Sequence, residues 1–154
     1  MVNKIKAKVL KKEILFVVIK PNVPTIVACD VVRIKRVIQS LLLHSVRFMR
    51  KHGKITISFE KSTLNIKGTS VPAFKVLIAD QGVGIPQDAL DRIFSDKTSK
   101  TRTKADSKEL QFAMCKKIID VHKGNIFAQN NPDGGVTFNI VLPYEQDEAS
   151  TDTD

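Results

Sequence analysis

The longest amphipathic pattern in the chain lies between residues 31 and 49. Side chains suited to a core recur there at spacings of three and four residues, which predicts a helix with one buried face. Asp30 stands just before it, where a side-chain oxygen can cap the first turn, and Gly53 stands just after it. The positions on the buried face are Ile34, Val37, Ile38, Leu41, Leu42, Ser45 and Met49.

Shorter runs of β-branched and aromatic residues, bounded by turn residues, predict strands. These strands are expected at residues 14–19, 25–29, 54–60, 73–80, 125–129 and 136–142. A turn-rich loop through Gly68 is expected to join the strands 54–60 and 73–80. Helical spacing returns in a short segment from Pro86 and in residues 110–121, whereas residues 95–108 have no apolar period and predict an exposed basic loop. Residues 2–11 fit either a helix or a strand.

The order of these elements predicts an α+β fold. Too many strands are hairpin neighbours for a doubly wound parallel sheet, so we expect a mixed, mostly antiparallel sheet with about three helices on one face. One domain is expected over residues 13–143, after a basic lead-in at 1–12 and before an acidic, disordered tail at 144–154.

Charge is distributed unevenly along the 154 residues. The chain carries +9, but its last ten residues hold five acids and no base, so the preceding 144 residues carry +14. Such a basic body suggests an anionic partner: nucleic acid, a membrane surface, an acidic protein or a phosphorylated small molecule. Two cysteines without a C-x-x-C pair favour a reduced setting, and every apolar run is shorter than the roughly 20 residues that span a bilayer.

Candidate chemistry begins where the strand 73–80 ends, with the sequence Asp80-Gln-Gly82-Val-Gly84-Ile85. A carboxylate at this position can accept a hydrogen bond from an exocyclic amine, and the glycines let the backbone approach a flat ring or a phosphate. By itself, the motif is equally compatible with an ordinary strand-to-helix turn. The three histidines and two cysteines show no metal-ligand spacing.

Several blocks of sequence give this motif its context. They lie at residues 30–48, 53–57, 80–86, 92–94, 113–126 and 135–143. In their order and spacing they resemble the ATP-binding catalytic domain of sensor histidine kinases, within the GHKL superfamily of ATPases. The resemblance extends from about Lys12 to Pro143 and implies a Bergerat-type α/β sandwich.

The resemblance implies a nucleotide-binding role for the matching residues. Asp80 would accept a hydrogen bond from the adenine amino group of ATP. Gly82, Gly84 and Ile85 would shape the floor of the pocket.

A second group of residues would serve the phosphates. Arg47 would face them, and residues 95–108 would close over them as an ATP lid, with Lys104 among its bases. Catalysis in this family is positioning plus charge stabilisation with Mg²⁺ between the phosphates, so no catalytic side chain is assigned. The γ-phosphoryl group would pass to a histidine of a dimerisation domain, in cis or in trans, and then to the receiver domain of a response regulator.

The chain departs from the family pattern in two places. The first long helix of the family offers two asparagines, the second of which holds Mg²⁺, and here these positions are Ser40 and His44. Neutral imidazole suits softer metals than Mg²⁺, so His44 is a weak metal-ligand candidate. The second glycine-rich box aligns with residues 107–112, where all three glycines are replaced and Glu109 would bring a carboxylate toward phosphate.

Two functional hypotheses therefore stay open. One is the ATP-binding catalytic domain of a two-component sensor histidine kinase, a phosphotransferase in a phosphorelay. The alternative is a degenerate, pseudokinase-like module that acts through protein–protein interaction. Nucleic-acid binding is the weakest hypothesis, because no helix-turn-helix, zinc finger or aromatic stripe accompanies the charge, and no membrane insertion is expected. We expect a cytoplasmic location, including as the cytosolic part of a larger sensor.

Overall fold

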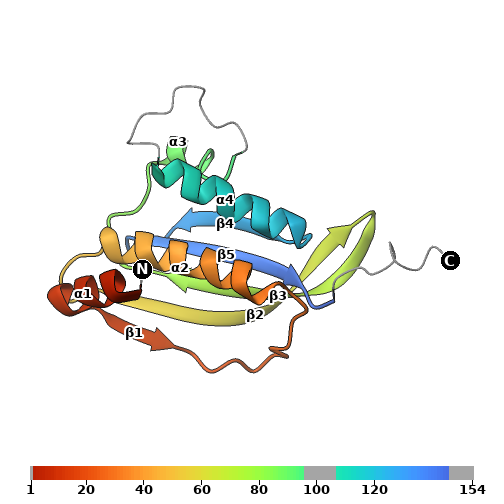
Figure 1. Ribbon diagram of the computed structural model, residues 1–154, viewed down its shortest axis with the longest axis horizontal. Helices are drawn as coiled ribbons and strands as arrows, with labels where there is room; N and C mark the ends of the chain where they lie inside the picture. The colour runs from red at the N-terminus through yellow and green to blue at the C-terminus, as the bar shows by residue number, and fades with distance from the viewer. Residues whose placement is uncertain (1, 96–106, 146–154) are drawn as a thin grey trace.

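The computed structural model describes residues 2–95 and 107–145 of the chain, and Figure 1 shows their arrangement as one sheet with helices on one of its faces. The helices are α1 (Val2–Lys12), α2 (Val31–Arg47), α3 (Gln87–Leu90) and α4 (Ser107–Val121). The strands are β1 (Leu15–Val18), β2 (Lys54–Ile66), β3 (Thr69–Ala79), β4 (Asn125–Asn130) and β5 (Val136–Pro143). The predicted α+β class is confirmed.

The five strands form one mixed sheet in the order β1-β2-β3-β5-β4. Only β1 and β2 pair in parallel, and the other three pairs are antiparallel. This topology brings the end of β3 beside the start of β5, which lies more than fifty residues further along the chain. The mostly antiparallel sheet expected from the hairpin neighbours is therefore the one that forms.

The hydrophobic core lies between the sheet and the helices. Residues directly opposite each other on neighbouring strands point to the same face, so the paired residues Ile57, Ile78 and Phe138 share one face. Ile78 and Phe138 are fully buried there. On the helix side, the core includes Val37 and Leu41 of α2, which have no exposed surface. The buried face predicted from the spacing in residues 31–49 is thus the face that packs on the sheet.

Two sequence predictions about strands were wrong. Residues 25–29 contain β-branched side chains but form no strand, and Ala28 bonds instead to the backbone of Tyr144. The expected loop between the strands 54–60 and 73–80 is largely sheet, because β2 and β3 stay paired up to Ile66 and Thr69.

The β2–β3 hairpin closes in a tight turn. Lys67 and Gly68 both have positive φ, which is the backbone of the two-residue turn that matches the twist of paired strands. Asn65 Oδ1 accepts a hydrogen bond of 2.9 Å from the Gly68 backbone N–H. The residues read as loop signals thus form the tip of a long hairpin.

Side chains join the helices at both ends of α2. At its start, Asp30 Oδ1 accepts from the Arg33 N–H at 3.2 Å, as predicted, and the Asp30 N–H donates to Nε2 of the buried His122 after α4 at 3.0 Å. At its end, Nζ of Lys12 donates to the carbonyls of Val46 and Arg47 at 3.0 and 2.8 Å. The basic lead-in is thus the helix α1, and it packs beside α2.

No helix in residues 2–95 or 107–145 has the length and apolar character that crossing a membrane requires. The predicted lid falls almost entirely on residues 96–106, which together with 146–154 lie outside the described residues. Lys104 is among them, and most of the predicted acidic tail lies outside as well.

Candidate functional site

Asp80 forms the floor of the candidate site at the end of β3. Its side chain is buried, and Oδ1 accepts two backbone hydrogen bonds, from the Gly82 N–H at 2.9 Å and from the Val136 N–H at 3.0 Å. The backbone of Asp80 also donates to the Val136 carbonyl at 2.9 Å. Among the described residues no hydrogen bond ends on Oδ2, so this second oxygen keeps its capacity to accept from a ligand.

Two glycines bring the backbone close to this carboxylate. A side chain at Gly82 would place its Cβ 2.8 Å from the carbonyl oxygen of Phe48, at the end of α2. Gly135 has φ +88°, and a Cβ there would overlap the Asp80 backbone and approach Oδ1 to 2.8 Å. The site is therefore a convergence of three segments: the end of β3, the end of α2 and the start of β5.

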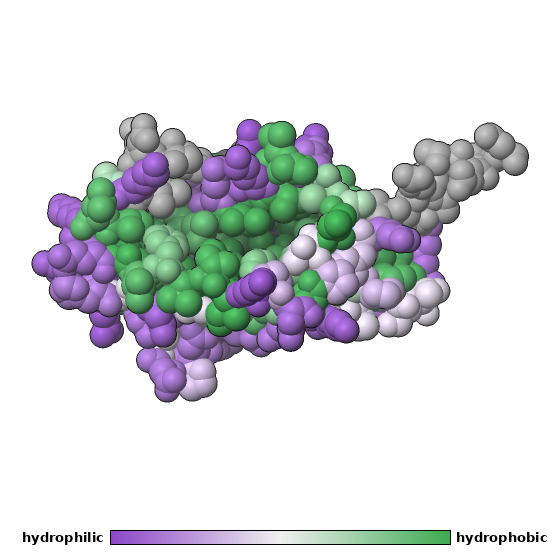
Figure 2. Space-filling model, turned by 90° about the horizontal axis from the view of Figure 1, so that it is seen from below, coloured by the Kyte–Doolittle hydropathy of each residue, from purple (hydrophilic) through white to green (hydrophobic). Residues whose placement is uncertain are grey.

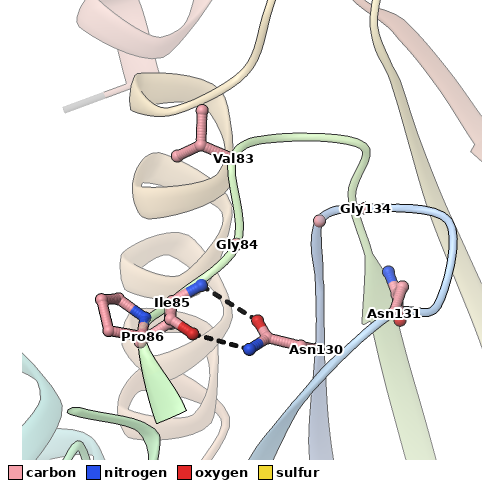
Figure 3. A pocket seen from close by; sticks show the side chains of 8 residues that line it. Val83, Gly84, Ile85, Pro86, Asn130, Asn131 and Gly134 are labelled. Carbon is pink, nitrogen blue, oxygen red and sulfur yellow. Dashed lines mark hydrogen bonds between the residues drawn. The ribbon is translucent and has the colours of Figure 1, made fainter. Parts of the chain in front are cut away.

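The turn after Asp80 is held from the other side by Asn130, the last residue of β4. Asn130 Oδ1 accepts from the Ile85 N–H at 2.9 Å, and its Nδ2 donates to the Ile85 carbonyl at 2.6 Å. Figure 3 shows this pair of bonds between the two segments. Gly84, which has φ +80°, precedes Ile85 and lies against the same amide.

A pocket of about 360 Å³ opens beside this turn. Its lining comes from the glycine turn and the β4–β5 hairpin, namely Val83, Gly84, Ile85, Pro86, Asn130, Asn131, Gly134 and Gly135. Asn131 Nδ2 donates to the Asp80 carbonyl at 3.1 Å and so joins the hairpin to the floor of the site. Asn130, Asn131 and Gly135 stand between the strands expected at 125–129 and 136–142 and were not among the predicted site residues.

Ser40, His44 and Arg47 share the flank of α2 that faces α4, because residues four and seven apart on a helix lie on the same side. Ser40 is buried and hydrogen-bonds the thiol of Cys115 in α4. Burial raises the pKa of Cys115 to about 11, so this thiol is protonated at neutral pH. Arg47 is exposed in the last turn of α2, directly before the Phe48 carbonyl that meets Gly82.

His44 lies among aromatic rings. Its ring centroid is 4.8 Å from that of Phe48, 5.2 Å from that of Phe112 and 5.5 Å from that of Phe138. Phe112 belongs to the segment that aligns with the second glycine box. Within the described residues, no three His, Cys, Asp or Glu side chains are grouped as a metal site. The imidazole of His44 and the hydroxyl of Ser40 do not fit Mg²⁺, which prefers several oxygen ligands. The metal-binding role of His44 remains a prediction.

The structure brings four of the predicted site residues together around one turn, namely Asp80, Gly82, Gly84 and Ile85. Arg47 precedes Phe48, whose carbonyl meets this turn at Gly82. Ser40 and His44 lie on the neighbouring flank of α2. The missed residues are Asn130 and Gly135; Gly135 begins one of the blocks that carry the family resemblance, but nothing local places either residue beside Asp80 or Ile85. Their contacts are with the Asp80–Ile85 segment, about fifty residues earlier, and no pattern of neighbouring residues indicates such a contact.

Comparison with protein families matches residues 29–146 to a model described as "Histidine kinase-, DNA gyrase B-, and HSP90-like ATPase". Among curated proteins, the adaptive-response sensory kinase SasA of Rippkaea orientalis is 33% identical over 129 residues, which is 81% of this chain and 30% of that protein. The hybrid signal transduction histidine kinase D of Dictyostelium discoideum is 28% identical over 137 residues, which is 86% of this chain and 9% of that protein. The chain thus spans about a third or less of the length of these relatives.

Solved structures of a histidine kinase share this fold. The nucleotide-free catalytic domain of histidine kinase ThkA matches with a TM-score of 0.72 at 26% identity, covering 94% of this chain and 88% of that domain. ThkA in complex with the response regulator protein TrrA matches with a TM-score of 0.69 at 24% identity, covering 96% of this chain and 40% of that chain.

Proposed function

Because the chain belongs to the histidine kinase-, DNA gyrase B- and HSP90-like ATPase family, we propose that it binds ATP beside the glycine turn that follows β3. We further propose that it serves as the phosphoryl-donor domain of a two-component sensor histidine kinase. The observation that carries the proposal is the Asp80 carboxylate, which is buried and held through one oxygen by two backbone N–H groups.

The arrangement of Asp80 supports the proposal of adenine recognition. Oδ1 of Asp80 is engaged with the backbone of Gly82 and Val136, which fixes the orientation of the carboxylate. Oδ2 would then accept from the exocyclic amino group of adenine, and an ionised acceptor makes such a bond stronger than a neutral one. Gly84 and Ile85 would supply backbone that a flat ring can approach, and the two bonds from Asn130 to Ile85 hold this backbone in place.

The phosphates would lie toward the end of α2. Arg47 is the exposed cation nearest in sequence to the Phe48–Gly82 contact, and it would offset part of the triphosphate charge. Lys104 would add a second positive charge from the lid segment. Mg²⁺, when bound, would neutralise phosphate charge, but Ser40 and His44 lack the amide oxygens of the family and no step is assigned through the metal.

The partners are proposed by family membership. The γ-phosphoryl group of ATP would be accepted by a histidine on a dimerisation domain, in this chain's own protein or in another, and then by an aspartate of a response-regulator receiver domain. ThkA, which shares the fold, has been solved in complex with the response regulator protein TrrA. We propose that such a domain works on the cytosolic side of the cell.

One observation favours the alternative, a pseudokinase-like module that works through protein contacts. Phe112 and His44 pack together where α2 meets α4, in the segment aligned with the second glycine box. Glycines at that position would expose backbone N–H groups to phosphate, and this chain has none there. ATP binding without transfer is the behaviour that this alternative predicts.

Calorimetric titration of the full chain with ATP tests the proposal, with Mg²⁺ in one series and with EDTA in the other. Asp80→Asn should weaken the binding of ATP by about 1–3 kcal/mol, which is roughly 5- to 150-fold in affinity, since a charge-assisted hydrogen bond is lost. Asp88→Asn is the matched control, because Asp88 is an exposed carboxylate on α3 paired with Arg92. Absence of binding at millimolar ATP in both series, or equal affinity of Asp80→Asn and the unaltered chain, would refute it.

A transfer assay separates the two functions. The full chain is incubated with radiolabelled ATP, Mg²⁺ and a purified histidine-bearing dimerisation domain. Label on the histidine supports the kinase and excludes the pseudokinase-like module. Binding of ATP without any label on the histidine supports the alternative.

A further inference from the structure

Burial on the helix-covered face of the sheet decreases sharply toward β1. Val18 of β1 pairs with Ile57 of β2, which pairs with Ile78 of β3, so the three side chains share this face. Ile78 is fully buried, whereas Val18 is 62% exposed. The layer of helices therefore leaves this edge of the sheet uncovered.

The flank of α2 that faces the same edge is apolar. Ser40 and His44 contact α4, and α4 lies over β4 at the opposite edge of the sheet. Ile38 and Leu42 lie about half a turn away from those residues, on the flank toward β1. Both are only half-buried, and Val31, on the same flank in the first turn, is 70% exposed.

Helix α1 covers one end of this flank. Lys12 binds the last carbonyls of α2, and Val9 packs against the core near that end. At the other end, His122 after α4 bonds to Asp30, and the next residue, Val31, is 70% exposed. We call the uncovered surface the β1–α2 groove and define it by Val18, Ile57, Val31, Ile38 and Leu42. Figure 2, which views the molecule from the β1 edge, shows it as a hollowed apolar face between two polar margins.

The surroundings of the groove are basic. Residues 1–36, which include α1, β1 and the start of α2, hold nine lysines and arginines and two acids. Glu13 is paired with His52 and Asp30 with Arg33, so both acids already have partners. The exposed lysines in this part of the chain include Lys6, Lys11, Lys20 and Lys35.

We propose that the β1–α2 groove binds an acidic amphipathic helix of a partner protein. The groove lies next to α2 on the helix-covered face of the sheet, in line with the contact between α1 and α2. A helix laid there would pack on both α2 and the sheet at the usual spacing of about 8–10 Å between helix axes. Apolar side chains at helical spacing would contact Ile38 and Val18, and carboxylates on the outer face would meet the basic margin.

The recessed shape distinguishes this occupant from a flat anionic surface. An interfacial membrane site presents apolar side chains outward, whereas Ile38 and Leu42 on α2 and Ile57 on β2 are half-buried. The proposal does not depend on nucleotide binding, because the groove borders the edge strand β1 and the glycine turn follows β3.

The test is an NMR titration of the full ¹⁵N-labelled chain without nucleotide. The probe is a synthetic helix of about 18 residues with leucine on one face and glutamate on the other, long enough to be stable once docked. Saturable shifts at residues 16–20, at 55–59 and along the Val31–Leu42 flank are expected. The affinity should fall severalfold from about 0.05 to about 0.5 M salt. A peptide of the same composition with scrambled order should not bind.

Variants at exposed positions test the location without disturbing the core. Val18→Glu and Val31→Glu should each lower the affinity for the probe helix about tenfold or more, because each puts a carboxylate into an apolar contact that faces an acidic helix. Val121→Glu is the matched control, since Val121 is 66% exposed on α4 and lies outside the groove. Equal affinity of all three variants, or no shift at millimolar probe, overturns the proposal.

Two other occupants would also overturn it. Sedimentation equilibrium of the chain alone would show a dimer that Val31→Glu abolishes if a second copy fills the groove. Co-sedimentation with phosphatidylserine vesicles, lost in Val18→Glu and combined with no binding of the probe, would assign the face to a membrane instead.

Discussion

The contact between Gly135 and Asp80 makes the sharpest prediction about the candidate site. Gly135 has φ +88°, and a Cβ added there would overlap the backbone carbonyl of Asp80. Gly134 next to it has φ +101°, but a Cβ there would find its nearest neighbour, the Gly82 carbonyl oxygen, 4.0 Å away. The two positions therefore share the backbone strain and differ in the collision.

The magnitudes follow from this difference. An alanine held at positive φ costs about 1–3 kcal/mol, and this cost applies to both Gly134→Ala and Gly135→Ala. Only Gly135→Ala adds a steric cost of about 1–3 kcal/mol, because Asp80 is held by its N–H bond to the Val136 carbonyl and by the Asn131 amide on its own carbonyl, and it cannot move without disturbing both. We expect Gly135→Ala to lower the free energy of unfolding by about 2–6 kcal/mol in total.

Urea and thermal unfolding followed by far-UV circular dichroism measure the effect. Each kcal/mol lowers Tm by about 2–4 °C for a domain of this size, so Gly135→Ala should melt clearly below Gly134→Ala. Equal destabilisation of the two variants within about 0.5 kcal/mol would show that the Asp80–Gly135 approach is not tight.

Three further predictions concern single contacts. Asn130→Ala should lower the free energy of unfolding by about 1–2 kcal/mol through its two bonds to Ile85, and mass-spectrometric hydrogen exchange should speed up in the glycine turn. His122→Leu should cost about 1–3 kcal/mol in urea unfolding, since the part-buried bond from the Asp30 N–H to Nε2 is lost; an unchanged midpoint would contradict that. Because the raised pKa of Cys115 stabilises the protein below pH 9, its contribution should disappear between pH 9 and about 11. The difference in unfolding free energy between the chain and Cys115→Ala should shrink over that window, and a constant difference would refute it.

Elements with a strong local period were the most predictable. The helix expected from residue 31 begins at Val31 with Asp30 as its cap, and it ends at Arg47, two residues before the predicted end. The helix expected at 110–121 is α4. Residues 2–11, which the pattern left open between helix and strand, form α1. Spacing of three and four residues is a property of neighbours along the chain, so it can be read without knowing the fold.

Strand predictions failed where pairing decides the outcome. Residues 25–29 have suitable side chains but no neighbouring strand, and a strand is stabilised by its pairs rather than by its own sequence. Residues 61–66 and 69–72 look like a polar loop, yet they pair with each other because the turn at Gly68 aligns them.

The candidate site divides in the same way. The motif from Asp80 to Ile85 could be identified from the sequence, because a carboxylate and two glycines at a strand end are a local pattern. Asn130 and Gly135 could not, because they meet Ile85 and Asp80 only after β5 has paired with β3. The turn Asn-Asn-Pro-Asp-Gly-Gly indicates that the chain reverses, and nothing in it indicates against which segment.

The sequence by itself therefore determined the elements, the family resemblance and the motif at the end of β3. It also determined that the body is strongly basic and that the second glycine box is absent. Only the tertiary structure decided which loop lies against Asp80, that His44 packs among phenylalanines, and that the β1 edge stays uncovered beside α2. The physical reason is that periodicity and turn chemistry act over a few residues. Sheet order and the gaps between helices depend on contacts between distant segments, and these are settled only when the whole core packs.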